Sequence, residues 1–440
     1  MSGPGLLLVL VLLVVIIMLA TGRWRADAFL LLIACAFVFG ISAGMGIGET
    51  LGAINKGFGG TLGGVGLVII FGAVIGAFLE RTGASGSIAS AMLRLVGKKR
   101  TPLAMSLTGF VVSIPVFCDS GFIVLVPLVK ALARKAAAGR LTLAVALATG
   151  LYAAHCLVPP TPGPIAAAVT VGADIGRVIV LGLPIALVLA IVGNLWAGRF
   201  SGELLPDEQL DQAQPQEMEP AKMPGIGRSV MPIAVPLMLI TLGSLFGQGE
   251  SAAAALIKGI GHPVFALGAG LTLAFALPGG QGERGSWIAA GIKSCAIVLA
   301  VTAAGGAFGN VIRLSSLGGY IQEVLGGWQQ AGVLVPFVLS AALKSAQGSS
   351  TVAMITSAAI VAPLLDTLGL GAGEWGPALA VVAIGCGSMT VSHANDSYFW
   401  VVSQMAGIPV PTAYRTYTTA TGLMGFTGAV LTLLVSLVLL

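Results

Sequence analysis

Long apolar stretches separated by short polar breaks run through most of the 440 residues of this chain. A helix needs about 20 apolar residues to cross the hydrocarbon core of a membrane. Stretches near this length are predicted at 5–20, 28–46, 61–79, 141–174, 177–197, 229–246, 262–277, 288–309, 375–405 and 418–440. The apolar runs are continuous rather than alternating, which argues against a transmembrane β-barrel. The pattern predicts an all-α polytopic membrane protein.

Two further apolar segments, 102–132 and 334–364, are each divided by a polar break. The first break is Cys118-Asp119-Ser120-Gly121 and the second is Gln347-Gly348-Ser349-Ser350. Each apolar arm is too short for a full span. We therefore predict two re-entrant hairpins, each preceded by an amphipathic connector, at 82–97 and 312–328.

The order of these elements repeats between the two halves of the chain. At one nearly constant offset, Gly72 and Gly76 fall opposite Gly305 and Gly309. We predict one repeat at 1–198, a cytoplasmic linker at 199–228 and a second repeat at 229–440. Each repeat holds about five spans and one hairpin, and because five is odd the second repeat is inverted. Inverted repeats with helices broken near the midplane are typical of secondary transporters.

Composition and charge agree with this class. Only 9% of residues are charged, against roughly 25% in soluble domains. The net charge of +5 comes from segments that flank the spans rather than from one patch, so nucleic-acid binding is not expected.

Basic residues flank both ends of 102–132, and the positive-inside rule places them in the cytoplasm. Counting outward from there puts both termini on the outer (periplasmic) side. The five cysteines lie in apolar segments without CxxC spacing and predict neither disulfides nor a metal site.

A polar cluster at 388–397 interrupts the span predicted at 375–405. It places His393, Asn395, Asp396 and four hydroxyl side chains within ten residues. Ionisable groups at that depth are costly and usually line an ion or substrate path. By the repeat offset, its partner is the proline-rich break of the span at 141–174. We expect the two breaks to face each other across a pocket.

Several segments, taken in order, resemble one known family. They are Gly59-Gly60-Thr61-Leu62-Gly63, the 117–122 tip, His155 with the prolines of 159–164, the 347–353 segment, and Ser392-His393-Ala394-Asn395-Asp396 with Trp400. Over nearly the whole chain they resemble the gluconate permease family of bacterial proton symporters. The resemblance implies a carrier of the bacterial cytoplasmic (inner) membrane that imports gluconate or a related sugar acid. The family is similar in architecture to other hairpin-containing anion symporters, which implies elevator-type motion. Such carriers commonly dimerise through scaffold helices, so a homodimer stays open.

The substrate that the resemblance implies is a small hydrophilic anion, which needs hydrogen-bond donors and acceptors. The substrate-binding candidates are Ser120, Gly121, Thr161, Gln347, Gly348, Ser349, Ser350, Thr351, Ser392 and Asn395. If Thr351 begins the second arm of its hairpin, free backbone N–H groups there would face the anion. Gluconate carriers have Glu where this chain has Asp119 and His where it has Thr161. A smaller hydroxy acid or a D-amino acid therefore stays open.

Asp119, His393 and Asp396 are the candidates for carrying the coupled proton. A carboxylate held away from water favours its neutral form, and Asp119 would repel an anionic substrate unless protonated. The alternative for Asp119 is a permanent ion pair with Lys344. His393 titrates near neutral pH, and a hydrogen bond to the backbone is an equal alternative. For His155 we favour a structural role. No metal or organic cofactor is expected, and sodium stays open as the coupling ion.

Two other classes of function compete with a carrier. An intramembrane hydrolase could use Asp119, Asp396 or His393, but no HExxH spacing occurs and the two aspartates lie in opposite repeats. A channel is the other option, and strict dependence of uptake on an ion gradient separates a carrier from a pore.

Overall fold

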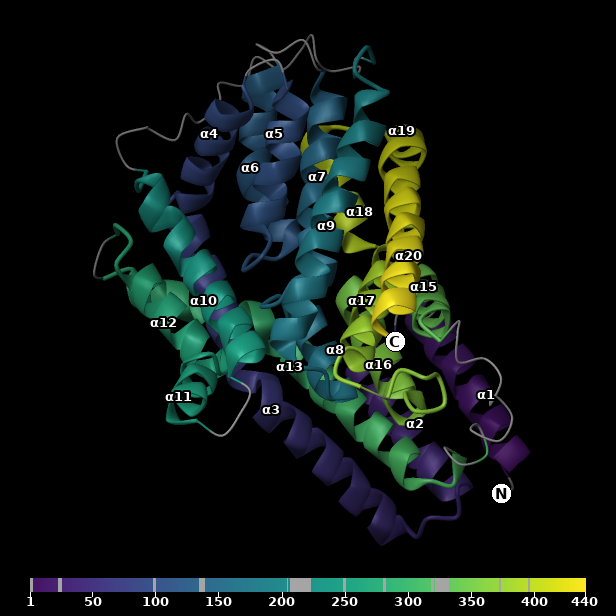
Figure 1. The fold of residues 1–440 in the computed structure, drawn as a ribbon. Helices are drawn as coiled ribbons and strands as arrows, with labels where there is room; N and C mark the ends of the chain where they lie inside the picture. The colour runs from purple at the N-terminus through teal and green to yellow at the C-terminus, as the bar shows by residue number, and fades with distance from the viewer. Residues whose placement is uncertain are drawn as a thin grey trace.

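The computed structural model describes residues 3–22, 26–97, 100–133, 139–203, 205, 223–247, 251–279, 282–317, 320, 332–371, 373–394 and 396–440. Every regular element within these ranges is a helix (Figure 1). Among the described residues, six helices are long and apolar enough to cross a membrane, and a bent pair of helices raises the number to seven. The prediction of an all-α polytopic membrane protein is confirmed.

The helices of the first half are α1 (Gly3–Gly22), α2 (Ala28–Ser42), α3 (Ile47–Arg81), α4 (Ala84–Val96), α5 (Thr101–Val112), α6 (Cys118–Ala133), α7 (Arg140–Leu157), α8 (Pro162–Val171) and α9 (Ile175–Gly198). Those of the second half are α10 (Ile226–Phe246), α11 (Ala252–Ile260), α12 (Pro263–Phe275), α13 (Arg284–Leu314), α15 (Leu334–Gln347), α16 (Ser350–Val361), α17 (Gly376–Met389), α18 (Ser397–Ala406), α19 (Val410–Ala413) and α20 (Thr419–Leu439). A 3₁₀ turn, Ala362–Leu364, continues α16. A π-helical turn, Tyr414–Thr418, joins α19 to α20.

The long helices α3 and α13 pack along each other in antiparallel directions (Figure 1). Gly57 lies against Gly306, whereas Val74, further along α3, lies against Gly291, earlier in α13. The sequence pattern predicted that this span would begin at residue 61, but α3 begins at Ile47. The glycines of its first half do not end the helix, because a glycine such as Gly57 lets the two backbones approach closely.

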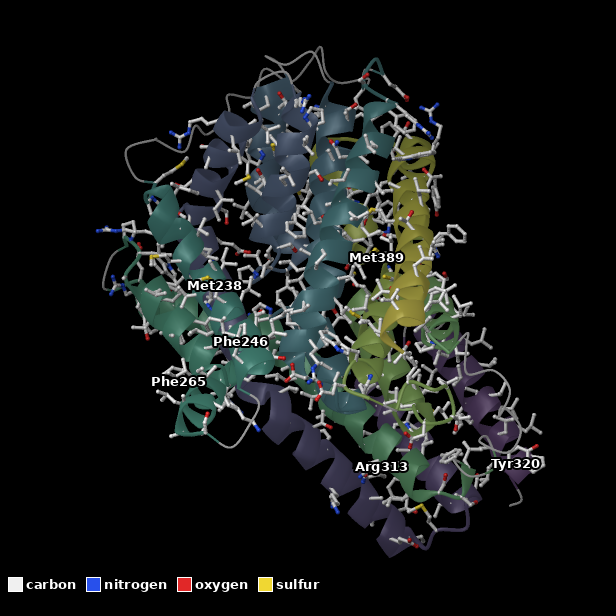
Figure 2. All side chains as sticks on the ribbon, viewed as in Figure 1. Met238, Phe246, Phe265, Arg313, Tyr320 and Met389 are labelled. Atoms are coloured by element: carbon white, nitrogen blue, oxygen red, sulfur yellow. The ribbon has the colours of Figure 1, made fainter. Side chains whose placement is uncertain are left out.

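Burial differs sharply between helices. Met238, Phe246 and Phe265 on α10 and α12 are 57–60% exposed, as expected for side chains that face lipid (Figure 2). In contrast, α7 is buried along its whole length. A fully buried helix in a membrane protein contacts protein on all sides, so α7 lies at the centre of the fold.

The first helical hairpin turns earlier than predicted. The turn between α5 and α6 covers residues 113–117, whereas the sequence pattern placed the tip at 117–122. Pro115 has no backbone N–H to donate and disfavours helix in the residue before it, so it lies in the turn. Asp119 and Ser120 consequently lie in the first turn of α6 rather than in a loop.

The second hairpin pairs α15 with α16. The two predicted helix breaks separate α7 from α8 at residues 158–161 and α17 from α18 at residues 390–396. Helix α16 packs against α8, α13, α15 and α17. Most of the predicted linker (204 and 206–222) and of the second connector (318–319 and 321–328) lies outside the described residues.

Candidate functional site

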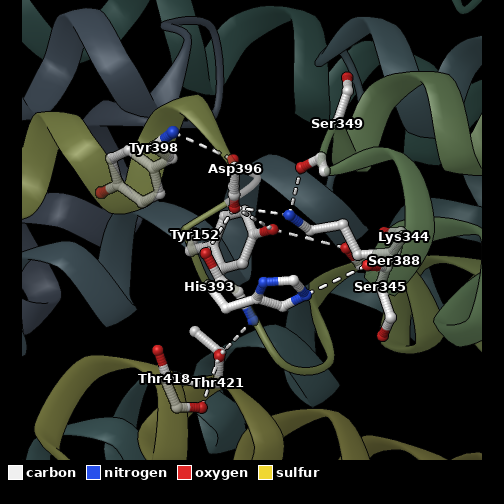
Figure 3. Close-up of polar contacts among 12 residues, drawn as sticks. Tyr152, Lys344, Ser345, Ser349, Ser388, His393, Asp396, Tyr398, Thr418 and Thr421 are labelled. Carbon is white, nitrogen blue, oxygen red and sulfur yellow. Dashed lines mark hydrogen bonds and ion pairs between the residues drawn. The ribbon is translucent and has the colours of Figure 1, made fainter. Parts of the chain in front are cut away.

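A buried ion pair joins the last turn of α15 to the residue that precedes α18 (Figure 3). Lys344 Nζ lies 2.5 Å from Asp396 Oδ2, and the two side chains are 0% and 4% exposed. Lys344 also donates to the carbonyl oxygen of Gly348. Asp396 is the N-cap of α18, because its Oδ1 accepts from the backbone N–H of Tyr398 at 3.0 Å. Buried charges are tolerated only when they are paired and hydrogen-bonded, as these are.

Hydroxyl groups surround the Asp396 carboxylate. Ser392 Oγ donates to Asp396 Oδ2 at 2.5 Å, and Tyr152 OH lies 3.5 Å from the same oxygen. Tyr152 comes from α7 and is also 3.4 Å from the carbonyl oxygen of Ser388 (Figure 3). The carboxylate is therefore held by residues from both halves of the chain.

A cavity of about 170 Å³ opens beside this ion pair. Polar side chains line it from α6, α7, α16 and the start of α18, and apolar ones complete the wall. The lining residues are Phe117, Cys118, Asp119, His155, Ile297, Val298, Val301, Ser349, Ser350, Thr351, Val352, Ile355, Asp396, Ser397 and Tyr398. A water molecule occupies about 30 Å³ in the liquid, so the space suits a small ligand.

Two polar atoms of this lining have no hydrogen-bond partner among the residues that the structure describes. They are Asp119 Oδ1 and His155 Nδ1, and both are buried. The other ring nitrogen of His155, Nε2, lies 3.5 Å from Thr351 Oγ1. Buried polar atoms are normally paired. A polar ligand in the cavity would satisfy both.

The N-terminus of α16 also opens into the cavity. Ser349 is its N-cap and accepts from the backbone N–H of Val352 at 3.3 Å. Gly348 precedes it with φ +87°, a left-handed conformation that favours glycine. Ser350 and Thr351 follow in the first turn and are buried. A helix N-terminus carries partial positive charge and free N–H groups, so it favours an anion.

The structure brings together part of the predicted site. Asp119, Ser349, Ser350, Thr351 and Asp396 line the cavity. Three more candidates lie beside it: Lys344 donates to Gly348 and to Asp396, and Ser392 donates to Asp396.

Other predicted residues point elsewhere. Thr161 Oγ1 donates to the carbonyl oxygen of Val158 at 2.6 Å, and the side chain of Ser120 lies beside that of Glu80. Gly121 packs against Leu151 of α7. His393 Nε2 lies 3.1 Å from the carbonyl oxygen of Ser345, which is the backbone alternative (Figure 3). Asn395 and the side chain of Gln347 lie outside the described residues.

The ion pair bears on the alternatives for Asp119. The sequence left open a permanent pair between Asp119 and Lys344, but Lys344 is bonded to Asp396 instead.

Sequence reasoning also gave no role to Tyr152 and only a structural one to His155. A lone tyrosine and a lone histidine three residues apart, in an otherwise apolar span, were the signal that could have found them.

Comparison with known proteins gives consistent matches over the whole length. The model of the GntP family permeases matches residues 5–438. The gluconate permease of Pseudomonas aeruginosa is 34% identical, with 95% of this chain and 94% of that protein covered. The D-serine transporter DsdX of Escherichia coli K12 is 32% identical, with 91% of each covered. The fold is similar to that of MtrF of Neisseria gonorrhoeae, with a TM-score of 0.68, 15% identity, and 95% and 96% of the two chains covered.

Proposed function

This chain belongs to the GntP permease family, and from that membership we propose that it imports gluconate or a related small hydroxycarboxylate by proton symport. Members of the family are multi-pass membrane permeases rather than enzymes, so the hydrolase hypothesis is set aside. The observation that carries the proposal is one cavity that combines a helix N-terminus, hydroxyl groups and a carboxyl group whose buried oxygen, Asp119 Oδ1, has no hydrogen-bond partner among the described residues.

The substrate carboxylate is assigned to the N-terminus of α16. Its positive end and the hydroxyls of Ser350 and Thr351 suit an anion, and α16 is long enough to carry a dipole. His155, on α7 beside Thr351, can exchange a hydrogen bond with a substrate hydroxyl through Nδ1, which has no partner among the described residues. The apolar side chains of α13 in the lining, such as Val301, would contact the carbon chain.

Asp119 is assigned as the proton carrier. Lys344 and Asp396 cancel each other's charge, so Asp119 is the lining carboxyl group whose charge no ion pair offsets within the described residues. Two like charges 4 Å apart repel by about 4 kcal/mol at an effective dielectric constant of 20. An anionic substrate therefore binds far better when Asp119 is protonated. This requirement couples uptake of the anion to uptake of a proton.

The two predicted repeats and the elevator motion are part of the proposal. In each half a hairpin of two helices, α5–α6 or α15–α16, precedes a broken helix, α7–α8 or α17–α18, which supports a shared ancestral plan. Placement in the bacterial inner membrane fits this family. A homodimer through scaffold helices stays a prediction.

Purified protein in proteoliposomes tests the proposal. An inward proton gradient without sodium should drive accumulation of labelled gluconate or a related acid above equilibrium. Asp119→Asn should abolish this accumulation and retain counterflow exchange at equal substrate concentrations. Glu49→Gln, which removes an exposed carboxylate at the start of α3, is the matched control and should transport normally. Accumulation that follows sodium and ignores pH would overturn the coupling, and D-serine and glycerate tested in parallel would identify a different substrate.

A further inference from the structure

A second cavity, of about 320 Å³, lies between α3, α8, α13 and the turn that follows α16. Two cationic side chains line it, Lys56 from α3 and Arg313 from α13. The other lining residues are small, apolar or neutral polar: Gly57, Gly60, Thr61, Val169, Thr170, Gly306, Gly309, Asn310 and Ala362. No carboxylate is among the lining residues in the described part of the chain. The cavity is therefore positively charged.

Close packing of α3 on α13 brings the two cations to one cavity. A Cβ atom built on Gly57 would lie 2.5 Å from the Gly306 carbonyl oxygen, and one on Gly306 would collide with Thr61. Asn310 then positions Arg313. Its Nδ2 donates to the carbonyl oxygen of Ala53 at 2.8 Å, which orients the amide, and its Oδ1 accepts from Arg313 Nη2 at 2.7 Å.

Among the described residues, neither cation has a counterion of its own. Within the described ranges no ion pair joins Lys56 or Arg313 to a carboxylate. Like charges that share a cavity repel, and an anion between them replaces the repulsion with attraction. A guanidinium group has five N–H donors, and the bond to Asn310 uses one. Arg313 therefore keeps donors in the planar arrangement that suits a carboxylate or a phosphate. Figure 2 labels Arg313 near the end of α13.

The two cavities lie at opposite ends of α16. Ser350, its first residue, lines the first cavity, and Ala362, just after its last residue, lines the second. At 1.5 Å per residue they are about 18 Å apart along the helix. The predicted topology puts the start of α3, and with it Lys56, on the outer side of the membrane.

We propose that the cavity around Lys56 and Arg313 is a second anion site, which binds the carboxylate of the substrate before it reaches the first cavity. Positive charge at such a place raises the local concentration of an anionic substrate. The ligand chemistry is that of an oxyanion, which a lipid phosphate shares with a free carboxylate. The identity of the free anion rests on the proposed function; the existence of an anion site does not.

Cysteine labelling tests the site independently of transport. Thr170 lines the cavity and is partly buried, so Thr170→Cys introduces a thiol there, and all five native cysteines are buried. The probes are a negatively charged and a positively charged methanethiosulfonate, each corrected for its rate with free cysteine. In neutral detergent, the negative reagent should react several-fold faster. Lys56→Gln with Arg313→Gln should remove this preference, and Lys258→Gln, which removes an exposed cation on α11, should keep it.

The outcomes separate the possible sources of the anion. Equal rates for the two reagents, or a preference that survives Lys56→Gln with Arg313→Gln, would overturn the site. Slower labelling by added gluconate supports the substrate as ligand. Slower labelling in phosphatidylglycerol vesicles than in phosphatidylcholine vesicles, with no effect of gluconate, assigns the site to a lipid headgroup instead. If gluconate is not transported but the charge preference stands, the proposed function fails and the anion site remains.

Discussion

At the scale of single residues, the chemistry of the first cavity is governed by which charges cancel. Lys344 and Asp396 are bonded to each other and buried. Asp119 has an oxygen without a partner among the described residues. The pair therefore acts as a neutral, polar wall, and Asp119 is left to respond to the charge of whatever enters. The proton is assigned to Asp119 because the charge of Asp396 is neutralised by Lys344, rather than because of any property of Asp119 alone.

Replacing the ion pair tests that division. Lys344→Met should leave the buried carboxylate of Asp396 without its ion-pair partner, and Asp396→Asn should do the same to the buried ammonium group of Lys344. Each single change should destabilise the protein by about 3–5 kcal/mol, whereas removing both charges should cost much less. Asparagine is as good an N-cap as aspartate, so the cap of α18 survives in Asp396→Asn. Thermal unfolding of the wild type, the two single variants and the double variant in detergent gives the coupling free energy between the two charges. If the loss of stability in the double variant equals the sum of the two single losses, the two charges are not paired.

Part of this cavity could be predicted from the sequence. A carboxylate and a run of hydroxyl residues beside glycine, in otherwise apolar segments, identify Asp119, Ser349, Ser350 and Thr351 as residues with no reason to be there except function or capping. The structure adds that these four residues line one cavity. Thr161 could not be excluded, because only the local backbone shows that its hydroxyl bonds to Val158. The role of Tyr152 depends on a contact between residues 244 positions apart, which no local pattern contains.

At the scale of elements, α13 lines both cavities, and its close contact with α3 forms part of the second. The sequence pattern placed these spans correctly in order but began α3 too late. Its first half is rich in glycine, which is disfavoured in isolated helices. The tertiary contact at Gly57 reverses that preference. Similarly, Pro115 decided where the first hairpin turns, although the polar residues that follow it suggested a later tip.

A pair of alanine substitutions in α3 tests this contact. Gly57→Ala places a methyl group 2.5 Å from the Gly306 carbonyl oxygen, and overpacking of this kind costs about 1–3 kcal/mol. Gly52→Ala, in the same helix, meets nothing within 4 Å. It should be neutral or stabilise by up to about 1 kcal/mol through helix propensity. Thermal unfolding in detergent should therefore rank Gly52→Ala above wild type or level with it, and Gly57→Ala below; equal midpoints for the two variants would contradict the packing.

At the scale of the whole molecule, charge predicts the orientation. Basic residues flank both ends of the α5–α6 hairpin, and the positive-inside rule places those ends in the cytoplasm. The predicted five spans on either side of the linker would then place both termini on the outer side. In an inverted arrangement the two hairpins then enter from opposite faces, as alternating access to a central cavity requires.

Reporter fusions test the orientation. Alkaline phosphatase folds only in the periplasm, so a fusion after Leu440 should be active, and a fluorescent protein that folds only in the cytoplasm should stay dark there. The same two reporters inserted in the 206–222 segment should give the reverse pattern. Matching patterns at the two positions would contradict an odd number of spans in the second half.

The central claim is that an anion binds in the first cavity together with a proton on Asp119, and proton release or uptake on binding measures it most directly. Gluconate is added to purified protein in lightly buffered detergent near neutral pH, and the change in pH is recorded. The wild type should take up as much as one proton per bound anion, and Asp119→Asn should bind gluconate without taking up any. Binding by the wild type without proton uptake, or undiminished uptake by Asp119→Asn, would contradict the account.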